Sequence, residues 1–320
     1  MKWLIALLVV LAALAGAFWY AMLDAAAPAQ AEGQFDLAGY RALVANDAAE
    51  TLPTEVRVEF VGASTAPSFA TEAGAFGPES AIVYTAFQIV APGGTTVLDG
   101  AVDAETAEAM GAGEFDAASY QRVLDAAAQA QHVLITHEHL DHVMAVARHP
   151  DPAALAPRLL LTRAQLERLP QHAPDGQLAP EIADAPPADF TTPQRIAPGV
   201  VAHATPGHTP GSIVVYARTA AREYLLIGDI VWMMSNIDTL RGRPRLIRWR
   251  LPEVDPDRPA VLRQIRALHD LREANPELII LPAHDEPYLR RLVGDGALID
   301  GFAATALENA ESTDAAAPAP

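Results

Sequence analysis

The chain has 320 residues, a formal net charge of −18 and no cysteine. So acidic a chain is a poor candidate for binding mainly to nucleic acid or to an anionic membrane surface, because both are bound through positive fields. Without cysteine there are no disulfides, so the stability of the fold must come from a hydrophobic core and from any bound metals.

The N-terminus carries Lys2 and then an uninterrupted apolar run to Leu23, about long enough to cross a bilayer core as a helix. This length favours an uncleaved membrane tether over residues 3–23, since the apolar region of a signal peptide usually has about 7 to 15 residues. Ala-Gln-Ala at residues 29–31 is also a plausible cleavage site. Residues 1–31 are therefore predicted to be a membrane anchor or a signal peptide. The remainder is predicted to be exported, to the periplasm or another extracytoplasmic space.

The rest of the chain shows no internal repeat and is predicted to form one domain. Residues 32–53 are rich in alanine and are predicted to be a spacer with a short helix at 35–44. The domain is expected over residues 54–310. Residues 311–320 have the small, polar and proline-rich composition of a disordered tail.

The first half of the domain predicts three strands followed by a helix. Residues 55–62 alternate apolar and charged side chains, as a half-exposed strand does. Residues 81–90 and 95–98 are apolar runs separated by a Pro-Gly-Gly turn, which predicts two further strands. The apolar positions of residues 116–130 have helical spacing, so a helix is expected to pack on the sheet there.

A dense group of metal-binding side chains follows the apolar, β-branched run at residues 132–136: His137, His139, Asp141 and His142. Alternation in an extended segment points the first two the same way, and a turn can bring the other two towards a second point. The pattern therefore predicts a site for two divalent metals. Imidazole and carboxylate ligands favour zinc, with manganese or iron as alternatives, over calcium or magnesium. A helix is predicted over residues 143–148.

The pattern His-x-His-x-Asp-His at residues 137–142 resembles the signature of the metallo-β-lactamase superfamily. This resemblance implies an α/β fold, a four-layer αββα sandwich, here preceded by the N-terminal apolar helix. It also implies further ligands after three later strands: His208 after residues 200–204, Asp229 after 223–227, and His284 after 278–282.

The resemblance divides these ligands between two metals. His137, His139 and His208 are expected to bind the first metal. Asp141, His142 and His284 are expected to bind the second, and Asp229 to bridge both. By the same resemblance, Asp99 is expected to orient the ligands through hydrogen bonds. His203 lies within a predicted strand and is interpreted as structural.

A proline- and alanine-rich region at residues 150–198 is interpreted as an insertion that shapes a substrate entrance. It is expected to contain a strand at 159–161 and a helix at 163–169. His149 and His172 lie outside any motif and are interpreted as surface residues. Further along, a helix is predicted over 258–273.

Five arginines gather within residues 239–250, together with Trp249: Arg241, Arg243, Arg245, Arg248 and Arg250. The favoured interpretation is a solvated loop that pairs with the protein's own carboxylates. Contact with an anionic substrate group or a docked partner is the alternative. Just before them, four residues are candidates for lining the pocket or for core packing: Trp232, Met233, Met234 and Asn236.

These features together predict a metal-dependent hydrolase of small-molecule substrates. Two ions that share a water molecule lower its pKa, so hydroxide becomes available near neutral pH to attack an ester, thioester or lactone. Asp141 and Asp229 are expected to hold metals rather than to act as a sole general base. Aspartate at 229 makes the pattern closest to hydroxyacylglutathione hydrolases and lactonases. Cleavage of a β-lactam or phosphodiester, an iron-dependent redox activity, and a non-catalytic metal-binding module are the alternatives.

Overall fold

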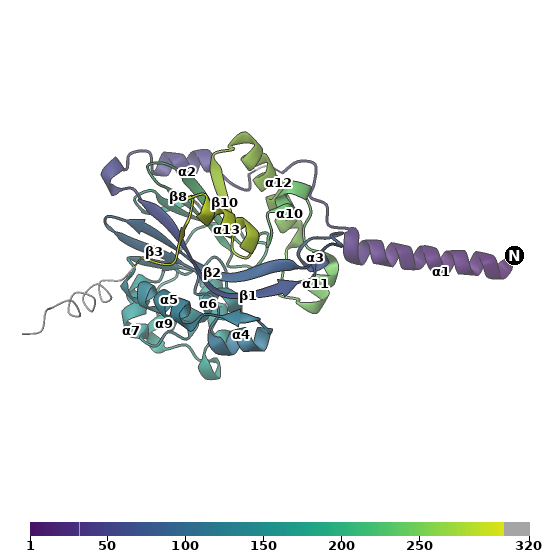
Figure 1. Ribbon diagram of the computed structural model, residues 1–320, viewed down its shortest axis with the longest axis horizontal. Helices are drawn as coiled ribbons and strands as arrows, with labels where there is room; N and C mark the ends of the chain where they lie inside the picture. Colours follow the sequence, from purple (N-terminus) through teal and green to yellow (C-terminus); the bar gives the residue numbers. More distant parts are fainter. Residues whose placement is uncertain (32, 304–320) are drawn as a thin grey trace, which may run out of the picture.

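A computed structural model describes residues 1–31 and 33–303 of the chain. The tail predicted over residues 311–320 lies outside the described residues, as does the end of the domain predicted at residue 310. Figure 1 shows a layered body from which one long helix projects.

Two sheets form the centre of the body. The first has the order β11-β1-β2-β3-β5, and β4 pairs with β1. Its strands are β1 Glu55–Ala66, β2 Ser80–Ala91, β3 Gly94–Leu98, β4 Glu114–Phe115, β5 His132–Leu134 and β11 Ile299–Asp300. The second has the order β10-β9-β8-β7-β6. Its strands are β6 Gln194–Ala197, β7 Val200–Ala204, β8 Ile213–Arg218, β9 Glu223–Gly228 and β10 Leu278–Pro282.

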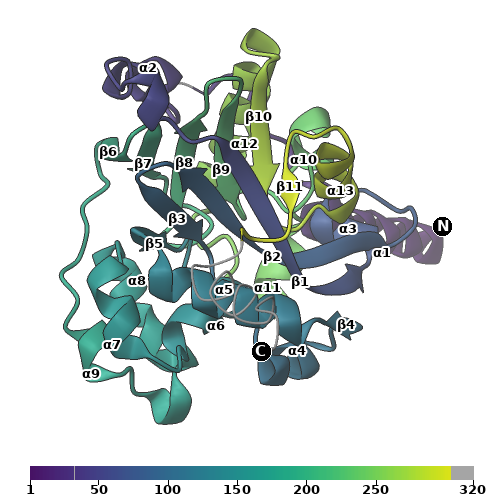
Figure 2. The ribbon, with the colours of Figure 1, turned by 60° about the vertical axis from the view of Figure 1, so that its left-hand side comes forward.

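Helices cover the outer faces of both sheets (Figure 2). Those beside the first sheet include α4 Ala104–Met110, α5 Ala117–Gln129, α6 Leu140–Ala147, α7 Pro152–Leu155, α8 Arg163–Arg168 and α9 Pro180–Ala183. Those nearer the second sheet and its edges are α2 Leu37–Leu43, α10 Ser235–Thr239, α11 Arg245–Arg250, α12 Arg258–Ala274 and α13 Glu286–Gly294. The short helix α3, Ser68–Thr71, follows β1.

Three buried clusters explain why these layers hold together. Between the sheets, Val58 and Phe87 of the first sheet belong to one apolar cluster with Val215 and Leu226 of the second. A second cluster joins α5 and α6 to the outer face of the first sheet. A third joins α2 and α12 to the outer face of the second. Burial on both faces of both sheets gives the four αββα layers predicted from the sequence.

The predicted strands at 55–62, 81–90, 95–98, 200–204, 223–227 and 278–282 correspond to observed strands. The strand predicted at 159–161 is wrong. Leu159 makes one isolated bridge to Val133 of β5, because a tight helical turn ends at Arg158 and α8 begins at Arg163. The chain is extended there for too few residues to build a ladder. Strands β6 and β8 had not been predicted.

The interpretation of His149 and His172 as surface residues is also wrong. His149 is buried, and its Nε2 lies 3.1 Å from the carbonyl oxygen of Leu124 in α5. His172 is half-buried, and its Nε2 lies 3.0 Å from the carbonyl oxygen of Glu138. Each imidazole thus contacts a backbone carbonyl oxygen of a distant segment, a role that sequence spacing does not reveal.

The segment predicted as a spacer packs on the second sheet through α2. Tyr40 is fully buried, and its hydroxyl lies 2.6 Å from Nδ1 of His203 in β7. His203 thus has the structural role expected of it. Arg41 forms an ion pair with Glu223 at the start of β9, and the Tyr216 hydroxyl donates to the same carboxylate over 2.6 Å.

The helix that projects from the body consists of α1, Lys2–Phe18, and a π-helical turn, Trp19–Leu23. This 22-residue stretch is long and apolar enough to cross a membrane, and none of its most apolar window is buried. Beyond it the chain returns to the body, where Ala26 pairs with Arg241.

Gly100 allows the turn after β3 to touch α6. A Cβ added at Gly100 would lie 2.9 Å from the backbone nitrogen of Ala145. Gly100→Ala should therefore push α6 outward and lower the free energy of unfolding by roughly 1–3 kcal/mol. Urea unfolding measures this change. Gly93→Ala is the matched control, since nothing lies within 4 Å of a Cβ there; an equal loss in both variants would contradict the packing argument.

Glu223 should stabilise the protein in a pH-dependent way. Burial alone would raise the pKa of Glu223, but hydrogen bonds from Arg41 and Tyr216 hold this pKa below its usual value. A lowered folded-state pKa adds stability above the unfolded pKa of about 4.3, and this stability is lost as the pH falls through the folded value.

Glu223→Gln should therefore cost about 1 kcal/mol at pH 7, a modest figure because the Arg41 side chain is 37% exposed. The difference from the wild type should shrink below about pH 4. Urea unfolding across this pH range measures it. Glu277→Gln, which removes a 62% exposed partner of the same arginine, should have a smaller effect.

Candidate metal centre

The ends of four segments meet at one edge of the two sheets. His137 lies just beyond β5, His208 in the loop between β7 and β8, Asp229 directly after β9, and His284 two residues after β10. Gly228 makes the approach of β9 possible, because it has φ +51° and a Cβ there would lie 2.7 Å from the Thr136 side chain. The structure therefore brings together side chains from the whole length of the domain.

Asp141 and His142 reach this edge differently from the prediction. The sequence predicted a turn followed by a helix from residue 143, but α6 begins at Leu140 and His139 is its N-cap. Asp141 and His142 thus lie in the first helical turn, where a carboxylate interacts favourably with the helix dipole. The helix fixes both side chains relative to one another more firmly than a turn would.

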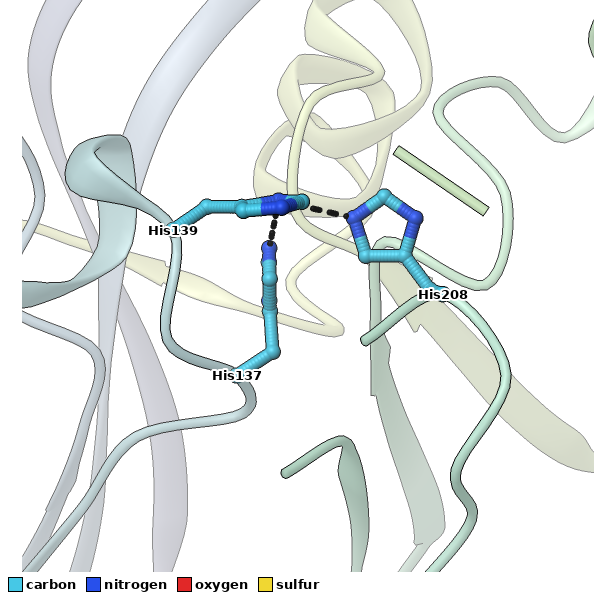
Figure 3. A group of neighbouring side chains, drawn as sticks. All are labelled: His137, His139 and His208. Atoms are coloured by element: carbon cyan, nitrogen blue, oxygen red, sulfur yellow. Dashed lines mark hydrogen bonds between the residues drawn. The ribbon is translucent and has the colours of Figure 1, made fainter. Parts of the chain in front are cut away.

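Three imidazoles form the first group (Figure 3). His139 Nδ1 lies 3.1 Å from His137 Nε2 and 3.1 Å from His208 Nε2. Asp229 approaches the same point, with its Oδ2 at 3.8 Å from His137 Nε2 and 3.6 Å from His208 Nε2. Four potential ligand atoms therefore surround one position.

The second group lies on the other side of Asp229. His142 Nε2 and His284 Nε2 are 3.2 Å apart. Asp229 Oδ1 lies 3.3 Å from His142 Nε2 and 3.1 Å from His284 Nε2. The Asp141 carboxylate is 3.4 Å from His284 Nε2 and 3.9 Å from His142 Nε2. Asp229 Oδ2 also lies 3.1 Å from His284 Nε2, so the carboxylate lies between the two groups and closer to the second.

The donor set fits divalent metal ions. Within the groups His137–His139–His208, His137–His142–Asp229 and Asp141–His142–His284, all ligand atoms lie within 4.8 Å of one another. Ligand atoms about 2.0–2.2 Å from a common tetrahedral ion have similar spacing. Asp229 Oδ1 is buried without a hydrogen-bond partner among residues 1–31 and 33–303. An orphaned carboxylate oxygen beside crowded imidazole nitrogens is the environment that a cation would satisfy.

The electrostatics differ between the two groups. Burial lowers the pKa of His139 to about 3, and the neighbouring His208 adds to this effect. Burial also holds the pKa of His137 well below its usual value. For His142 and His284, burial opposes protonation, but the Asp229 carboxylate outweighs it and raises the pKa of both. The first group therefore offers imidazole lone pairs at neutral pH, whereas the negative charge of Asp229 dominates the second group.

Hydrogen bonds on the far side of the rings fix their orientation. His284 Nδ1 lies 2.7 Å from the Val83 carbonyl oxygen, which can only accept, so Nδ1 carries the proton and Nε2 faces the centre. His142 Nδ1 lies 3.0 Å from Asp99 Oδ2, and Asp99 Oδ1 accepts from the Thr136 backbone over 2.6 Å. The contact of Asp99 with His142 is the kind expected from the sequence. Such contacts set the tautomer of a metal-binding histidine.

Asp255 orients His208 in the same way and had not been identified from the sequence. Its Oδ1 lies 2.8 Å from His208 Nδ1. Arg243, which is buried, donates to both oxygens of Asp255 and to the carbonyl oxygen of Asp229. Burial would raise the pKa of Asp255, but Arg243 and His208 hold it well below its usual value.

The interpretation of the arginine segment as solvated is therefore wrong for Arg243, which is buried. Its position among clustered arginines was the only signal in the sequence.

Two further side chains hold the centre together. Glu138 lies between His137 and His139 in the sequence, but its side chain points away from the centre. Its carboxylate accepts hydrogen bonds from the Thr209 hydroxyl over 2.7 Å and from the Gly211 backbone over 3.1 Å. These bonds tie the loop that carries His208 to the segment that follows β5. The Trp232 indole donates to Asp229 Oδ2 over 2.7 Å.

Of the four predicted pocket residues, Trp232 is thus the one with a hydrogen bond to the centre. Asn236 is buried and bonds to the backbone of Thr71 and Arg241, which is a packing role. Met234 is buried in the cluster that includes α12, and Met233 packs against the cluster that includes α6.

The comparison of sequences gives one family. A family model described as the metallo-beta-lactamase superfamily matches residues 80–284 of the chain. The matched stretch begins at the first residue of β2 and ends at His284, so it contains all seven predicted ligands. No curated protein matches the chain.

Solved structures with a similar fold include three hydrolases. An N-acyl homoserine lactone hydrolase, with N-hexanoyl-L-homoserine bound at its catalytic metal centre, has 16% identity and a TM-score of 0.55 over 75% of this chain and 96% of its own. A quorum-quenching N-acyl homoserine lactone lactonase has 15% identity and a TM-score of 0.57 over 77% and 96%. A probable metal-dependent hydrolase from Staphylococcus aureus has 13% identity and a TM-score of 0.55 over 73% and 91%. Identities this low speak for the fold alone.

Removal of the Asp255 carboxylate should weaken metal binding without unfolding the protein. Asp255→Asn leaves His208 in place but removes the charge that fixes its ring, so metal affinity should fall by roughly 10–100-fold. Competition with a chromogenic chelator measures the affinity. Asp270→Asn, on the exposed side of α12, is the control and should leave it unchanged. An Asp255→Asn variant with wild-type affinity would show that Asp255 has no orienting role.

Proposed function

The chain belongs to the metallo-beta-lactamase superfamily and is a metal-dependent hydrolase of that fold. From this premise we propose that it cleaves a lactone or a related ester or thioester. The reaction would use two divalent metal ions, and zinc is the metal we propose. His137, His139 and His208 would hold one ion, and Asp141, His142 and His284 would hold the other. The Asp229 carboxylate, which lies between the two groups, would contribute to both.

The position of Asp229 is the observation that carries the proposal. Its carboxylate lies between the two groups of nitrogen donors. Oδ2 is 3.6–3.8 Å from the nearest nitrogens of His137 and His208, and the second group lies 3.1–3.3 Å from the carboxylate oxygens. A purely structural metal site needs only four ligands around one ion and leaves no position open. Seven ligand side chains around a shared carboxylate suit a two-metal hydrolytic centre instead.

The residues of this chain have separate tasks in the reaction. Two bound divalent ions would supply hydroxide at neutral pH and positive charge opposite the substrate's carbonyl oxygen. Neutral His137 and His139 keep their lone pairs available for binding because burial disfavours their protonation. Asp99 and Asp255 hold the rings of His142 and His208 in place. Trp232 fixes one oxygen of Asp229 through its indole N–H.

A lactone or ester is favoured over other substrates by the ligand set and by analogy of fold. Aspartate at 229, in a chain without cysteine, separates this centre from those that place a cysteine there. Two solved structures of the same fold are lactone hydrolases, which supports this choice by analogy. Cleavage of a β-lactam or a phosphodiester is the alternative within the same chemistry.

We also propose that the domain is exported and remains tethered by its N-terminal helix. Residues just beyond the helix support retention of the leader. Ala25 is buried, the Ala27 backbone donates to Leu240 over 2.8 Å, and the Gly242 backbone donates to Ala25 over 2.9 Å. Cleavage after residue 31 would remove these contacts and expose the surface they cover, so a retained anchor is the simpler arrangement.

Loss of a ligand should abolish metal retention and hydrolysis together. His137→Ala removes one imidazole of the first group, and Asp229→Ala removes the bridge. Both variants should lose metal on dialysis and show no turnover, as measured by elemental analysis and a hydrolysis assay. His269→Ala, on α12 and outside both groups, should behave as the wild type. Full activity in either ligand variant would disprove the site.

The substrate class can be tested directly on purified full-length protein. Metal content is measured by elemental analysis, and turnover is compared across lactone, thioester, β-lactam and phosphodiester substrates. We expect about two zinc ions per chain and hydrolysis of lactones or esters. Turnover of β-lactams or phosphodiesters alone would overturn the substrate assignment. Iron with no hydrolytic turnover would favour a redox activity.

A further inference from the structure

We propose that α11 and the turn at Phe76 form a membrane-seating surface that rests on the anionic phospholipid headgroups of the bilayer crossed by α1. This surface consists of Phe76, Arg245, Arg248, Trp249, Arg250 and Leu251. The inference rests on the proposed retention of the N-terminal helix and goes beyond it, because a tether alone leaves the orientation of the domain free.

Direct contacts place this surface at the base of the helix. The Tyr20 and Trp249 rings have centroids 6.2 Å apart, and the Arg245 guanidinium lies over the Tyr20 ring at 4.3 Å. On the other side, the Phe18 and Phe76 rings stack at 6.2 Å. Figure 1 shows α11 and α3 beside the end of α1 where it joins the body.

These contacts set the depth of the surface relative to a bilayer. The apolar helix has 22 residues and a length of roughly 33 Å at about 1.5 Å per residue, close to the 30 Å of a hydrocarbon core. Trp19 and Tyr20 lie at its domain end, where aromatic residues mark the membrane interface. Because Trp249 and Phe76 contact residues of this end, they lie at the level of the headgroups.

The exposed side chains suit that level. Phe76, Trp249 and Leu251 are 64%, 57% and 43% exposed, a concentration of large apolar side chains that water does not favour. Arg248 and Arg250 are exposed beside them. Their side chains form no hydrogen bond or ion pair within the part of the chain that the structure describes. An apolar set flanked by unpaired arginines is the composition of an interfacial, headgroup-binding surface.

The charge of this surface is opposite to that of the whole chain. The chain has a formal net charge of −18, which disfavours binding of the whole protein to an anionic bilayer surface. In a tethered domain, however, the face next to the tether is the one that contacts the bilayer. Here Arg245 neutralises Asp24 over 2.6 Å, and Glu253 is the nearest carboxylate along the chain from α11. Arg248 and Arg250 remain to face lipid phosphates, within reach of a Debye length of about 10 Å at 0.1 M salt.

The surface is also connected to the metal centre. Arg243, which binds Asp255 and the Asp229 backbone, is separated from α11 only by Pro244. Seating of α11 would therefore hold the metal centre at a fixed position relative to the bilayer. A substrate with an acyl chain partitioned into the membrane would meet a centre of fixed orientation.

The test uses the full-length chain in liposomes and exploits its lack of cysteine. A single fluorophore is attached through Leu251→Cys, and a control fluorophore through Glu181→Cys on α9, which lies far from α1 in Figures 1 and 2. Nitroxide-labelled lipids should quench the first fluorophore and not the second, and the quenching should be stronger with phosphatidylglycerol than with phosphatidylcholine alone.

The arginines can be tested with the same label. Arg248→Ser/Arg250→Ser should lower the ratio of protein whose α11 contacts the membrane to protein whose α11 faces water. The expected decrease is about fivefold per arginine, roughly 25-fold together. Arg163→Ser/Arg168→Ser on α8 is the matched control and should change nothing.

Each other outcome would overturn the proposal in a recognisable way. Flotation with liposomes but equal quenching at both positions would disprove the seating surface and leave the tether intact. Failure to float would disprove the tether and the seating surface together, while the hydrolysis assays would be unaffected. Quenching that does not respond to phosphatidylglycerol or to the arginines would exclude headgroup recognition. Self-quenching at Leu251→Cys that grows with protein density, without lipid quenching, would assign the surface to a second copy of the chain.

Discussion

The structure depends on one buried carboxylate. Asp229 lies among five imidazoles and has an oxygen without a hydrogen-bond partner in the described part of the chain. Removing such a charge from water is costly unless opposite charge compensates it. Asp229 raises the pKa of His142 and His284, which shows how strongly this position attracts positive charge. Metal ions would supply such charge at a place where imidazole nitrogens lie about 3 Å apart.

Such crowding is stable only if the ligands cannot turn away. The outer nitrogens of His142, His208 and His284 contact Asp99, Asp255 and a carbonyl oxygen, respectively. Asp99 and Asp255 both have positive φ angles, 66° and 53°. Residues other than glycine adopt this conformation at a cost, and such strain is concentrated at functional sites. The two backbone turns that carry the orienting carboxylates are therefore held by the surrounding fold.

Arg243 joins the metal centre to the rest of the molecule. It links Asp255 and the backbone of Asp229 on one side and leads directly into α11 on the other. The segment before it, residues 240–242, pairs with residues 25–27 just beyond the apolar helix. One continuous set of contacts thus runs from the base of the helix to the centre of the site.

The sequence by itself determined the main strands and the ligand cluster at residues 137–142, because apolar strands have a readable period and the cluster has a fixed spacing. The resemblance of that cluster to the metallo-β-lactamase signature added the layered fold and the ligands His208, Asp229 and His284. The sequence did not reveal Asp255, His149 or the buried state of Arg243. Asp255 lies 47 residues from the histidine it orients, and no local pattern encodes such a contact. Leu159 to Leu161 had the composition of a strand, but the neighbouring turns prevented a ladder. Contacts between distant segments decide these features, since packing overrides local preference wherever buried polar groups must find partners.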